Sequence, residues 1–220
     1  SDWSSDVCSS DLKNFTFSKE EVYSAAKRLH LSVTAFYMLP AALALSAYNA
    51  TENVMISWNY HGRSDVRTQR ALGMFIRDYP VKFSFNKDNK VKKICGELGA
   101  QLREGILHGR VSPFMDRNKK ELLCFLYQGD LLKLPDSSIL KDMDIPEVPD
   151  QAAIEPMEFR INEEEGKVSA EVTYDQRIYY RESMERFIEL YERIIKELFE
   201  KGSGNMSLGD IFSRAGLDEQ

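Results

Sequence analysis

Four stretches of the chain have a pattern of apolar residues that predicts a helix. In three of them an apolar side chain returns every three or four residues, which places these side chains on one face of a helix. The fourth is apolar almost throughout. Because it is too long for a strand and too short for a membrane span, it predicts a buried helix. We expect helices at 19–29, 33–50, 89–107 and 181–201.

Local sequence signals add detail to the first two predicted helices and predict a further helix near the C-terminal end of the sequence. Ser18 precedes Glu21 by three residues, which is the capping-box pattern of a helix start. Pro40 lies inside the apolar helix and has no amide hydrogen, so we expect it to kink the helix or to restart it. A short final helix is expected at 208–215, after a Gly-Ser-Gly-Asn linker at 202–205.

Short runs rich in β-branched and aromatic residues predict strands. The predicted strand at 74–85 contains Pro80, where we expect an interruption. The predicted strands at 157–162 and 167–174 flank a Glu-Gly-Lys turn at 165–167, which is typical of a hairpin. Three acids, Glu163–Glu165, predict a solvated hairpin tip. The segment 130–156 contains four prolines and scattered acids and predicts a long loop. The strands are expected at 54–58, 74–85, 121–129, 157–162 and 167–174.

The order of these elements predicts a mixed α/β fold, one sheet with flanking helices. The order is not a regular alternation of strand and helix. Neither a GxGxxG nor a GxxxxGK[ST] loop occurs in the sequence. A dinucleotide-binding fold is therefore not expected.

Composition narrows the class of protein further. The chain of 220 residues carries 29 basic and 35 acidic side chains, a net charge of −6, and has no basic stripe, so nucleic-acid binding is not expected. No window reaches the roughly 18 consecutive apolar residues of a membrane span. Three cysteines without a CxxC pair exclude a disulfide scaffold and a zinc ribbon, and they favour a cytoplasmic protein with reduced thiols.

The first twelve residues differ from the rest of the chain. They read SDWSSDVCSSDL, with no apolar periodicity and without the basic start and apolar stretch of a signal peptide. The string is similar to the translation of a common sequencing-adaptor oligonucleotide, which implies that residues 1–12 are not native and that the true N-terminus is missing. We expect residues 1–12 to be unpacked, a folded domain at 13–201, and a linker with a short terminal helix at 202–220.

Residue spacing alone shows no complete catalytic constellation. The three histidines, His30, His61 and His108, include no pair with metal-ligand spacing, so no metal site is expected, and no GxSxG nucleophile elbow occurs. His61 follows a strand, where sites often occur, and is a weak candidate for a catalytic base. Cys95 and Cys124 lie on apolar stripes, which favours small core residues over nucleophiles.

Several motifs occur in an order that resembles one known family. The apolar helix 33–50 is followed by a strand, a Gly-Arg pair, a Gly-x-Phe stretch with a later proline, and a closing hairpin and helix. In this order, residues 13–201 resemble the C-terminal lobe of the condensation domain of nonribosomal peptide synthetases, a relative of chloramphenicol acetyltransferase. Arg77 and Asp78 stand where the family has Asn-Thr. The matching positions are Gly62, Arg63, Gly73, Phe75, Ile76, Pro80, Pro113 and Phe114.

The resemblance implies half of an enzyme whose two lobes enclose a tunnel. Peptidyl or acyl carrier proteins dock at its opposite mouths, and each delivers an acyl group as a thioester on a phosphopantetheine arm; no bound cofactor is implied. The catalytic signature of the family, His-His-xxx-Asp-Gly, belongs to the N-terminal lobe and is absent from this sequence. We therefore expect no catalytic residue in this chain and no activity from it alone. Its expected partners are the carriers, the missing N-terminal lobe and an adjacent adenylation domain.

The resemblance also nominates site residues. Gly73 has no side chain, so it would allow close approach of a backbone or of pantetheine. Arg63 is expected to fix its loop or to pair with an acid across the lobe, the first role being favoured. The residues expected to line the half-tunnel are Ser57, Asn59, Tyr60 and Gly73. Those expected to be structural or to contact the other lobe are Arg63, Phe75 and Pro80.

Two other classes of function stay open. The chain can belong to an epimerising or ester-forming relative, or to a stand-alone acyltransferase of the same superfamily. It can also be a non-catalytic module that docks carrier proteins. If the chain is one lobe of two, the face that meets the other lobe is exposed when the chain is alone.

Overall fold

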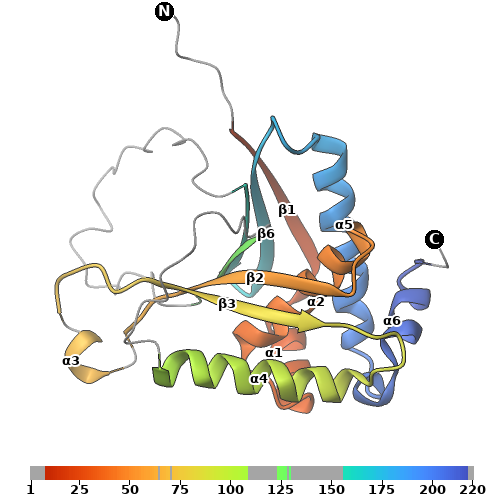
Figure 1. Ribbon diagram of the computed structural model, residues 1–220, viewed down its shortest axis with the longest axis horizontal. Coiled ribbons are helices and arrows are strands. Elements are labelled where there is room, and N and C mark those ends of the chain that lie inside the picture. The colour runs from red at the N-terminus through yellow and green to blue at the C-terminus, as the bar shows by residue number, and fades with distance from the viewer. Residues whose placement is uncertain are drawn as a thin grey trace, which may run out of the picture.

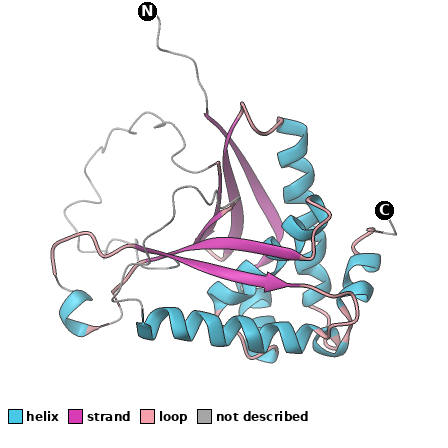
Figure 2. Cartoon of the chain, viewed as in Figure 1, coloured by secondary structure: helices cyan, strands magenta, loops and turns pink. Residues whose placement is uncertain are grey.

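The described chain forms one six-stranded sheet with helices packed against it (Figure 1, Figure 2). The computed structural model describes residues 8–63, 65–69, 71–108, 123–127, 129 and 156–217. The strands are β1 (Cys8–Ser18), β2 (Asn53–Tyr60), β3 (Arg77–Ser84), β4 (Cys124–Tyr127), β5 (Met157–Glu164) and β6 (Lys167–Asp175). The helices are α1 (Lys19–Arg28), α2 (Val33–Tyr48), α3 (Val66–Gln69), α4 (Val91–His108), α5 (Arg181–Leu198), a 3-10 turn (Ser203–Asn205) and α6 (Leu208–Arg214).

The sheet is mixed, as the sequence predicts. Its strand order is β1-β6-β5-β4-β2-β3. The short strand β4 runs parallel to both of its neighbours, β2 and β5, whereas the other neighbouring pairs are antiparallel. Figure 1 shows β2 and β3 lying across the view while β1 and β6 rise steeply, so the sheet is strongly twisted.

The β5–β6 hairpin shows how alternation in the sequence produces this sheet. Met157, Phe159 and Ile161 are buried, and the residues between them are half-exposed. The turn residues Glu165 and Gly166 have φ values of 48° and 81°, and positive φ at both central positions is the geometry of a two-residue hairpin turn. The predicted hairpin is confirmed.

The apolar helix α2 is the centre of the core. It contacts α1, α4, α5 and β2, and twelve of its residues are buried. Pro40 lies inside one continuous helix, so the helix does not restart there. Burial contributes about 25 cal/mol per Å² of apolar surface, and over a helix covered on several sides this outweighs the one hydrogen bond that proline cannot donate.

The N-terminal strand corrects the prediction of an unpacked N-terminus for Cys8 to Leu12, whereas residues 1–7 lie outside the described residues. Strand β1 begins at Cys8, and Cys8 to Leu12 pair in register with β6. Asp11 also accepts a hydrogen bond of 2.9 Å from the Tyr174 hydroxyl. Pairing uses backbone groups, which any extended segment supplies, so a polar sequence without apolar periodicity can still complete a sheet. The adaptor-like origin of residues 1–12 stays a prediction.

Two further expectations change in the structure. Strand β3 continues through Pro80 instead of breaking there. It is an edge strand, where proline is tolerated because its nitrogen can face away from the neighbouring strand. The 202–205 segment is packed and not a free linker, because Ser203 is fully buried and its hydroxyl donates to the Leu198 carbonyl at 3.1 Å.

The predicted solvated tip is also wrong at its first residue. Glu163 belongs to the inward-facing set of β5, and its side chain is only 1 % exposed. Lys19 Nζ lies 2.9 Å from its Oε2, and the Tyr37 hydroxyl donates to its Oε1 at 2.8 Å. Burial, reinforced by the Glu163 hydrogen bond, raises the pKa of Tyr37, which keeps this hydroxyl protonated as a donor. Glu164 and Glu165 are exposed, as expected.

Other expectations are confirmed or fall outside the described residues. The Ser18–Glu21 capping box is present, and the final helix α6 forms within the predicted span. The predicted loop 130–156 lies outside the described residues except for Pro156. Within the part of the chain that the structure describes, no single helix is long and apolar enough to cross a membrane, although the bent pair α1 and α2 has the required length and composition.

Candidate functional site

One face of the sheet carries the apolar core, and the other carries a row of mostly polar side chains. In Figure 2 the helices gather behind and below the strands β2 and β3. On the opposite face, strand register aligns Asp78 of β3 with Asn59 of β2, and Asn59 with Leu126 of β4. The row continues through Arg160 and Glu171. This polar row crosses five strands and is the first part of the candidate site.

Two groups of contacts organise the polar row. Asn59 Nδ2 donates to Asp78 Oδ1 at 3.1 Å. Burial raises the pKa of the half-buried Asp78 carboxyl above its ordinary value, and the Asn59 hydrogen bond opposes this shift. Further along, Arg160 pairs with Glu158 at 2.7 Å and with Glu171 at 3.3 Å. The row therefore presents an amide and a carboxyl side by side and, beyond Leu126 of β4, a guanidinium held by two acids.

The candidate wall residues of β2 fall on two different faces. Ser57 and Asn59 lie on the polar face, because they are two residues apart in a strand. Tyr60 lies on the other side. There its ring is 5.0 Å from the Trp58 ring and 6.1 Å from the Tyr79 ring. Tyr60 therefore supports the end of β2 from the core side and does not share a wall with Asn59.

Arg63 holds together the loop that follows β2. Its guanidinium donates to the carbonyls of Thr68, Ala71 and Gly73 at 2.5, 2.8 and 2.9 Å, and it lies 4.6 Å from the centre of the Phe75 ring. All of these partners lie in the segment between β2 and β3. The loop-fixing role that the sequence favoured for Arg63 matches these contacts.

Gly62 is the tightest position of the same loop. Its φ is +69°, and a Cβ atom placed there would lie 1.8 Å from the Phe75 carbonyl oxygen. Only glycine fits this position, because a side chain would overlap backbone atoms. Gly73 also has a positive φ, +142°, but a Cβ atom placed there would come no closer than 3.5 Å, to the edge of the Phe75 ring. We call the segment 61–76, closed by Gly62, Arg63 and Phe75, the clamped loop.

His61 begins the clamped loop and shapes its turn. Its Nδ1 accepts the Arg63 backbone N–H at 3.0 Å, and its ring packs on Tyr60 at 4.4 Å. Burial, followed by the positive charge of Arg63, lowers the pKa of His61. A neutral imidazole whose Nδ1 already accepts a hydrogen bond carries its proton on Nε2. His61 is thus engaged in loop structure, which weakens the case for it as a base.

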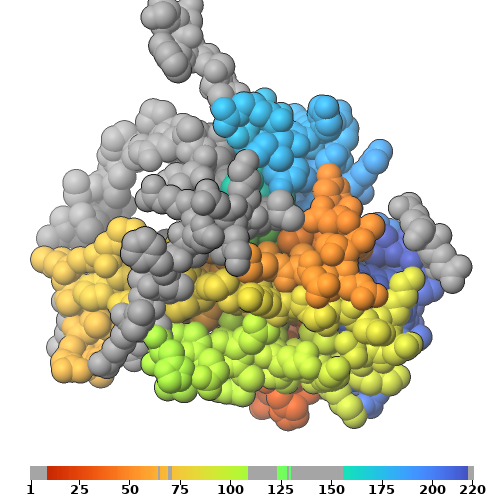
Figure 3. Space-filling model, viewed as in Figure 1, coloured from red at the N-terminus to blue at the C-terminus, as the bar shows by residue number. Residues whose placement is uncertain are grey.

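The clamped loop also exposes apolar side chains. Leu72 and Met74 are almost completely exposed, Val66 is 73 % exposed, and Ile76 is about half exposed. In Figure 3 the orange-yellow residues of this loop form a projection at the left edge of the molecule. Leu107, in the last turn of α4, is 69 % exposed. Exposed apolar side chains gathered on one segment are typical of a protein contact surface.

The remaining sequence candidates are core residues or lie elsewhere. Burial raises the pKa of the Cys95 thiol to about 12, so it is an inert core residue. Cys124 is buried, and His108 forms an exposed pair with Glu104 on α4. The described residues contain no group of three or more His, Cys, Asp or Glu side chains that could hold a metal ion. Pro113 and Phe114 lie outside the described residues.

A comparison with protein families identifies the fold. The family model for the condensation domain matches residues 4–216. The chain belongs to the condensation-domain family. The match includes the whole of strand β1 and extends beyond the predicted domain limits of 13 and 201 on both sides. A search of curated proteins gave no match.

Solved structures of condensation-type domains share this fold. A holo four-domain nonribosomal peptide synthetase bound to AMP and glycine matches with a TM-score of 0.72 and 14 % identity, over 92 % of this chain and 17 % of that one. The first condensation domain of the CDA synthetase matches with a TM-score of 0.66 and 10 % identity, over 93 % of this chain and 47 % of that one. The epimerization domain from the third module of tyrocidine synthetase B matches with a TM-score of 0.66 and 15 % identity, over 88 % of this chain and 48 % of that one. This condensation-family chain thus spans about half the length of the two separate domains.

Asp78 and Arg160 are the site residues that sequence reasoning missed. The alternation of apolar residues in β3 indicates the face on which Asp78 lies. Tyr79, Val81 and Phe83 point to the core, so Asp78 points to the opposite face of the sheet. Arg160 likewise lies on the face of β5 opposite to its buried apolar residues. Alternation indicates the face of each strand, but only the register shows that Asp78 lies beside Asn59.

Proposed function

We propose that this chain is the C-terminal lobe of a nonribosomal peptide synthetase condensation unit and that it forms amide bonds only together with an N-terminal lobe. The condensation-family match over residues 4–216 carries this proposal. Two observations support the two-lobe interpretation. The sequence lacks His-His-xxx-Asp-Gly, and the chain spans about half of a separate condensation domain.

The proposed reaction joins two carrier-bound thioesters. The acceptor amine nitrogen attacks the thioester carbonyl carbon of the donor, and a tetrahedral oxyanion forms. The carbon–sulfur bond then breaks, the donor phosphopantetheine leaves as its thiol, and the amine loses a proton as the amide forms. A histidine of the N-terminal lobe would accept or position that proton. The carriers, and an adenylation domain that loads them, are the partners this reaction requires.

This chain would supply one wall of the tunnel. Asn59 and Asp78 together present a hydrogen-bond donor and acceptors on the polar face. A phosphopantetheine arm contains two amide groups, which need both kinds of partner when water is excluded. Ser57 lies one position along the same face. The clamped loop, with Leu72 and Met74 exposed, would contact the N-terminal lobe.

Epimerisation is the second candidate, because the tyrocidine synthetase epimerization domain has the same fold with the same TM-score as the CDA condensation domain. The two activities give different products. Condensation transfers the donor acyl group to the acceptor carrier, whereas epimerisation inverts a stereocentre without transfer. A non-catalytic carrier-docking module would give neither product.

We expect no peptide product when this chain is mixed with two loaded carrier proteins, and product when the cognate N-terminal lobe is added. Mass spectrometry of the acceptor carrier measures the transferred acyl group, and chiral analysis measures epimerisation. In the two-lobe mixture, Asn59→Leu should lower kcat/KM about tenfold through the lost hydrogen bond. Asn53→Leu, at the exposed opposite end of β2, is the matched control and should change little.

The outcomes separate the alternatives. Product from this chain alone would contradict the proposal, as would a two-lobe mixture whose acyl transfer survives loss of the His-His-xxx-Asp-Gly histidines. Inversion without transfer would replace condensation by epimerisation. Carrier binding without either product in the two-lobe mixture would leave only a docking role.

A further inference from the structure

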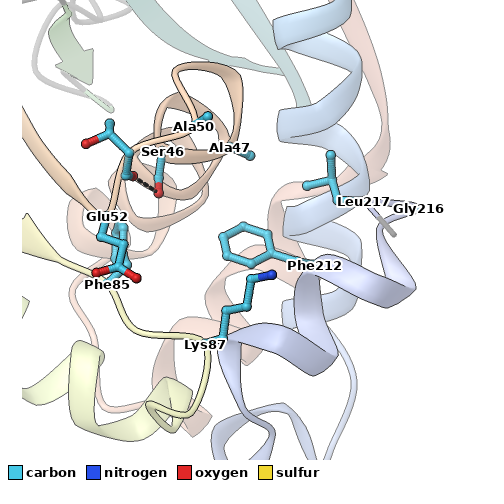
Figure 4. A pocket seen from close by; sticks show the side chains of 10 residues that line it. Ser46, Ala47, Ala50, Glu52, Phe85, Lys87, Phe212, Gly216 and Leu217 are labelled. Carbon is cyan, nitrogen blue, oxygen red and sulfur yellow. Dashed lines mark hydrogen bonds between the residues drawn. The ribbon is translucent and has the colours of Figure 1, made fainter. Parts of the chain in front are cut away.

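A cavity lies at the end of the sheet opposite to the clamped loop. Its volume is about 310 Å³, and its walls come from the end of α2, the start of β2, the turn after β3 and the end of α6 (Figure 4). Glu52 in this wall and Tyr60 beside the clamped loop are separated by the length of β2, roughly 25 Å at about 3.3 Å per residue. The cavity is therefore separate from the polar row at Asn59 and from the clamped loop.

The backbone of the cavity wall is held by its own hydrogen bonds. Ala50, two residues after the end of helix α2, has a φ of 48°, and the amides of Ala50 and Thr51 donate to the carbonyls of Ala47 and Ser46. Helix α6 ends in the same way at Gly216, whose φ is 76°. These are Schellman ends, which satisfy the last carbonyls of a helix internally. Both helix ends are therefore fixed before any ligand enters.

Two further hydrogen bonds fix the other walls. The Phe85 amide donates to the Glu52 carbonyl at 2.7 Å, and the Gly209 amide donates to the Lys87 carbonyl at 2.9 Å. The first connects the start of β2 to the turn after β3, and the second connects that turn to α6. A wall fixed in advance loses little conformational entropy when a ligand binds, which favours small-molecule binding.

The lining combines apolar surface with two opposite charges. Phe85, Phe212 and Leu217 supply apolar surface, and Figure 4 shows the Lys87 side chain lying alongside Phe212. Glu52 stands on the β2 side of the cavity. Both charged side chains are exposed, and neither forms an ion pair with another residue that the structure describes. A carboxylate and an ammonium are thus available at one apolar cavity.

We propose that this cavity binds a free amino acid with an apolar or aromatic side chain. The ligand ammonium would pair with Glu52, the ligand carboxylate with Lys87, and the ligand side chain would pack between the two phenylalanine rings and Leu217. A zwitterion matches the paired charges, whereas an anion or a cation alone leaves one of them unmatched. A volume near 310 Å³ is at the lower end of the about 300–1,000 Å³ range of ligand cavities, which fits one small molecule.

Three probes of similar shape test the charges separately by isothermal titration calorimetry on the full chain. The probes are L-phenylalanine, 2-phenylethylamine, which lacks the carboxylate, and 3-phenylpropanoate, which lacks the ammonium. L-phenylalanine should bind with a dissociation constant of the order of 1 mM, as expected for a ligand of this size. Each analogue should bind about tenfold more weakly, the loss expected for one charge-assisted contact.

Two variants assign the binding to this cavity. Glu52→Gln should weaken L-phenylalanine about tenfold and remove its advantage over 3-phenylpropanoate. Lys87→Met should weaken it similarly and remove its advantage over 2-phenylethylamine. Glu97→Gln and Lys93→Met, exposed on α4 and outside the cavity lining, are the matched controls and should bind like the parent. Thermal unfolding of every variant should match that of the parent, because both lining charges are exposed.

The inference is overturned by absence of L-phenylalanine binding at concentrations about tenfold above the expected constant. Equal affinity for the three probes would also overturn it, as would full binding by both lining variants. Because the cavity is separate from the polar row, these outcomes do not depend on whether the chain takes part in condensation.

Discussion

Replacement of Gly62 by alanine should release the clamped loop from the end of the sheet. The added methyl group would lie 1.8 Å from the Phe75 carbonyl oxygen, at a φ of +69° that favours glycine. Either the turn or the backbone of Phe75 must move, and Arg63 then loses its carbonyl partners. We expect the free energy of unfolding to fall by about 2 kcal/mol or more, from strained backbone and lost contacts. Urea unfolding measures this change.

Trypsin digestion reports on the loop itself. Arg63 and Arg67 should become early cleavage sites in the Gly62→Ala variant and stay protected longer in the parent. Gly96→Ala is the matched control, because Gly96 lies exposed inside α4 with no atom within 4 Å of an added Cβ. It should raise stability by about 0.5–1 kcal/mol. A Gly62→Ala protein with parental stability and protease resistance would show that the clamped loop is not closed at Gly62.

Replacement of Glu163 by alanine should destabilise the fold by about 3 kcal/mol, at the lower end of the about 3–5 kcal/mol typical of breaking a buried ion pair. The substitution leaves the buried Tyr37 hydroxyl without its acceptor and Lys19 without its counter-charge. Lys19 is 21 % exposed and can reach water, which limits the loss. Thermal and urea unfolding measure the effect.

Companion variants separate the contacts of Glu163 with Tyr37 and with Lys19. Glu163→Gln keeps an acceptor for Tyr37 but removes the ion pair with Lys19, so it should cost less than Glu163→Ala. Tyr37→Phe combined with Glu163→Ala should cost less than the sum of the single changes, because both remove the same hydrogen bond. Glu164→Ala, one residue away and exposed, should stay within about 0.5 kcal/mol of the parent. If Glu163→Ala and Glu164→Ala changed the free energy of unfolding by equal, small amounts, this would contradict a buried ion pair between Glu163 and Lys19.

The sequence predicts the elements whose signals are local. The capping box at Ser18 and the hairpin turn at Glu165–Gly166 depend on residues within a few positions of each other, and both are present. Strand β1 was missed because its partners lie far along the chain, from Lys167 to Asp175, and because Asp11 and its neighbours show no alternation of apolar residues. Burial of Glu163 was foreseeable from alternation in β5, but the run of three acids suggested solvent instead.

The candidate site was predictable only in part for the same reason. Gly62 and Arg63 were found by resemblance, yet the need for glycine arises from Phe75, thirteen positions further along the chain. The resemblance nominates Asn59, whereas its hydrogen-bond partner Asp78 becomes visible only when β2 and β3 are in register. Tyr60 was grouped with Asn59 by proximity in sequence, although neighbouring residues of a strand point to opposite faces.

Direct association between this chain and the cognate N-terminal lobe tests the central claim that the chain is one lobe of two. Sedimentation velocity of an equimolar mixture at micromolar concentration measures it. We expect a one-to-one complex with a buried area of about 600–1,500 Å², as in interdomain contacts of this kind. The pair Leu72→Asp and Met74→Asp should weaken the complex at least about tenfold, since both side chains are exposed on the clamped loop. Two separately sedimenting species at all concentrations would show that the chain is not one lobe of a two-lobe unit.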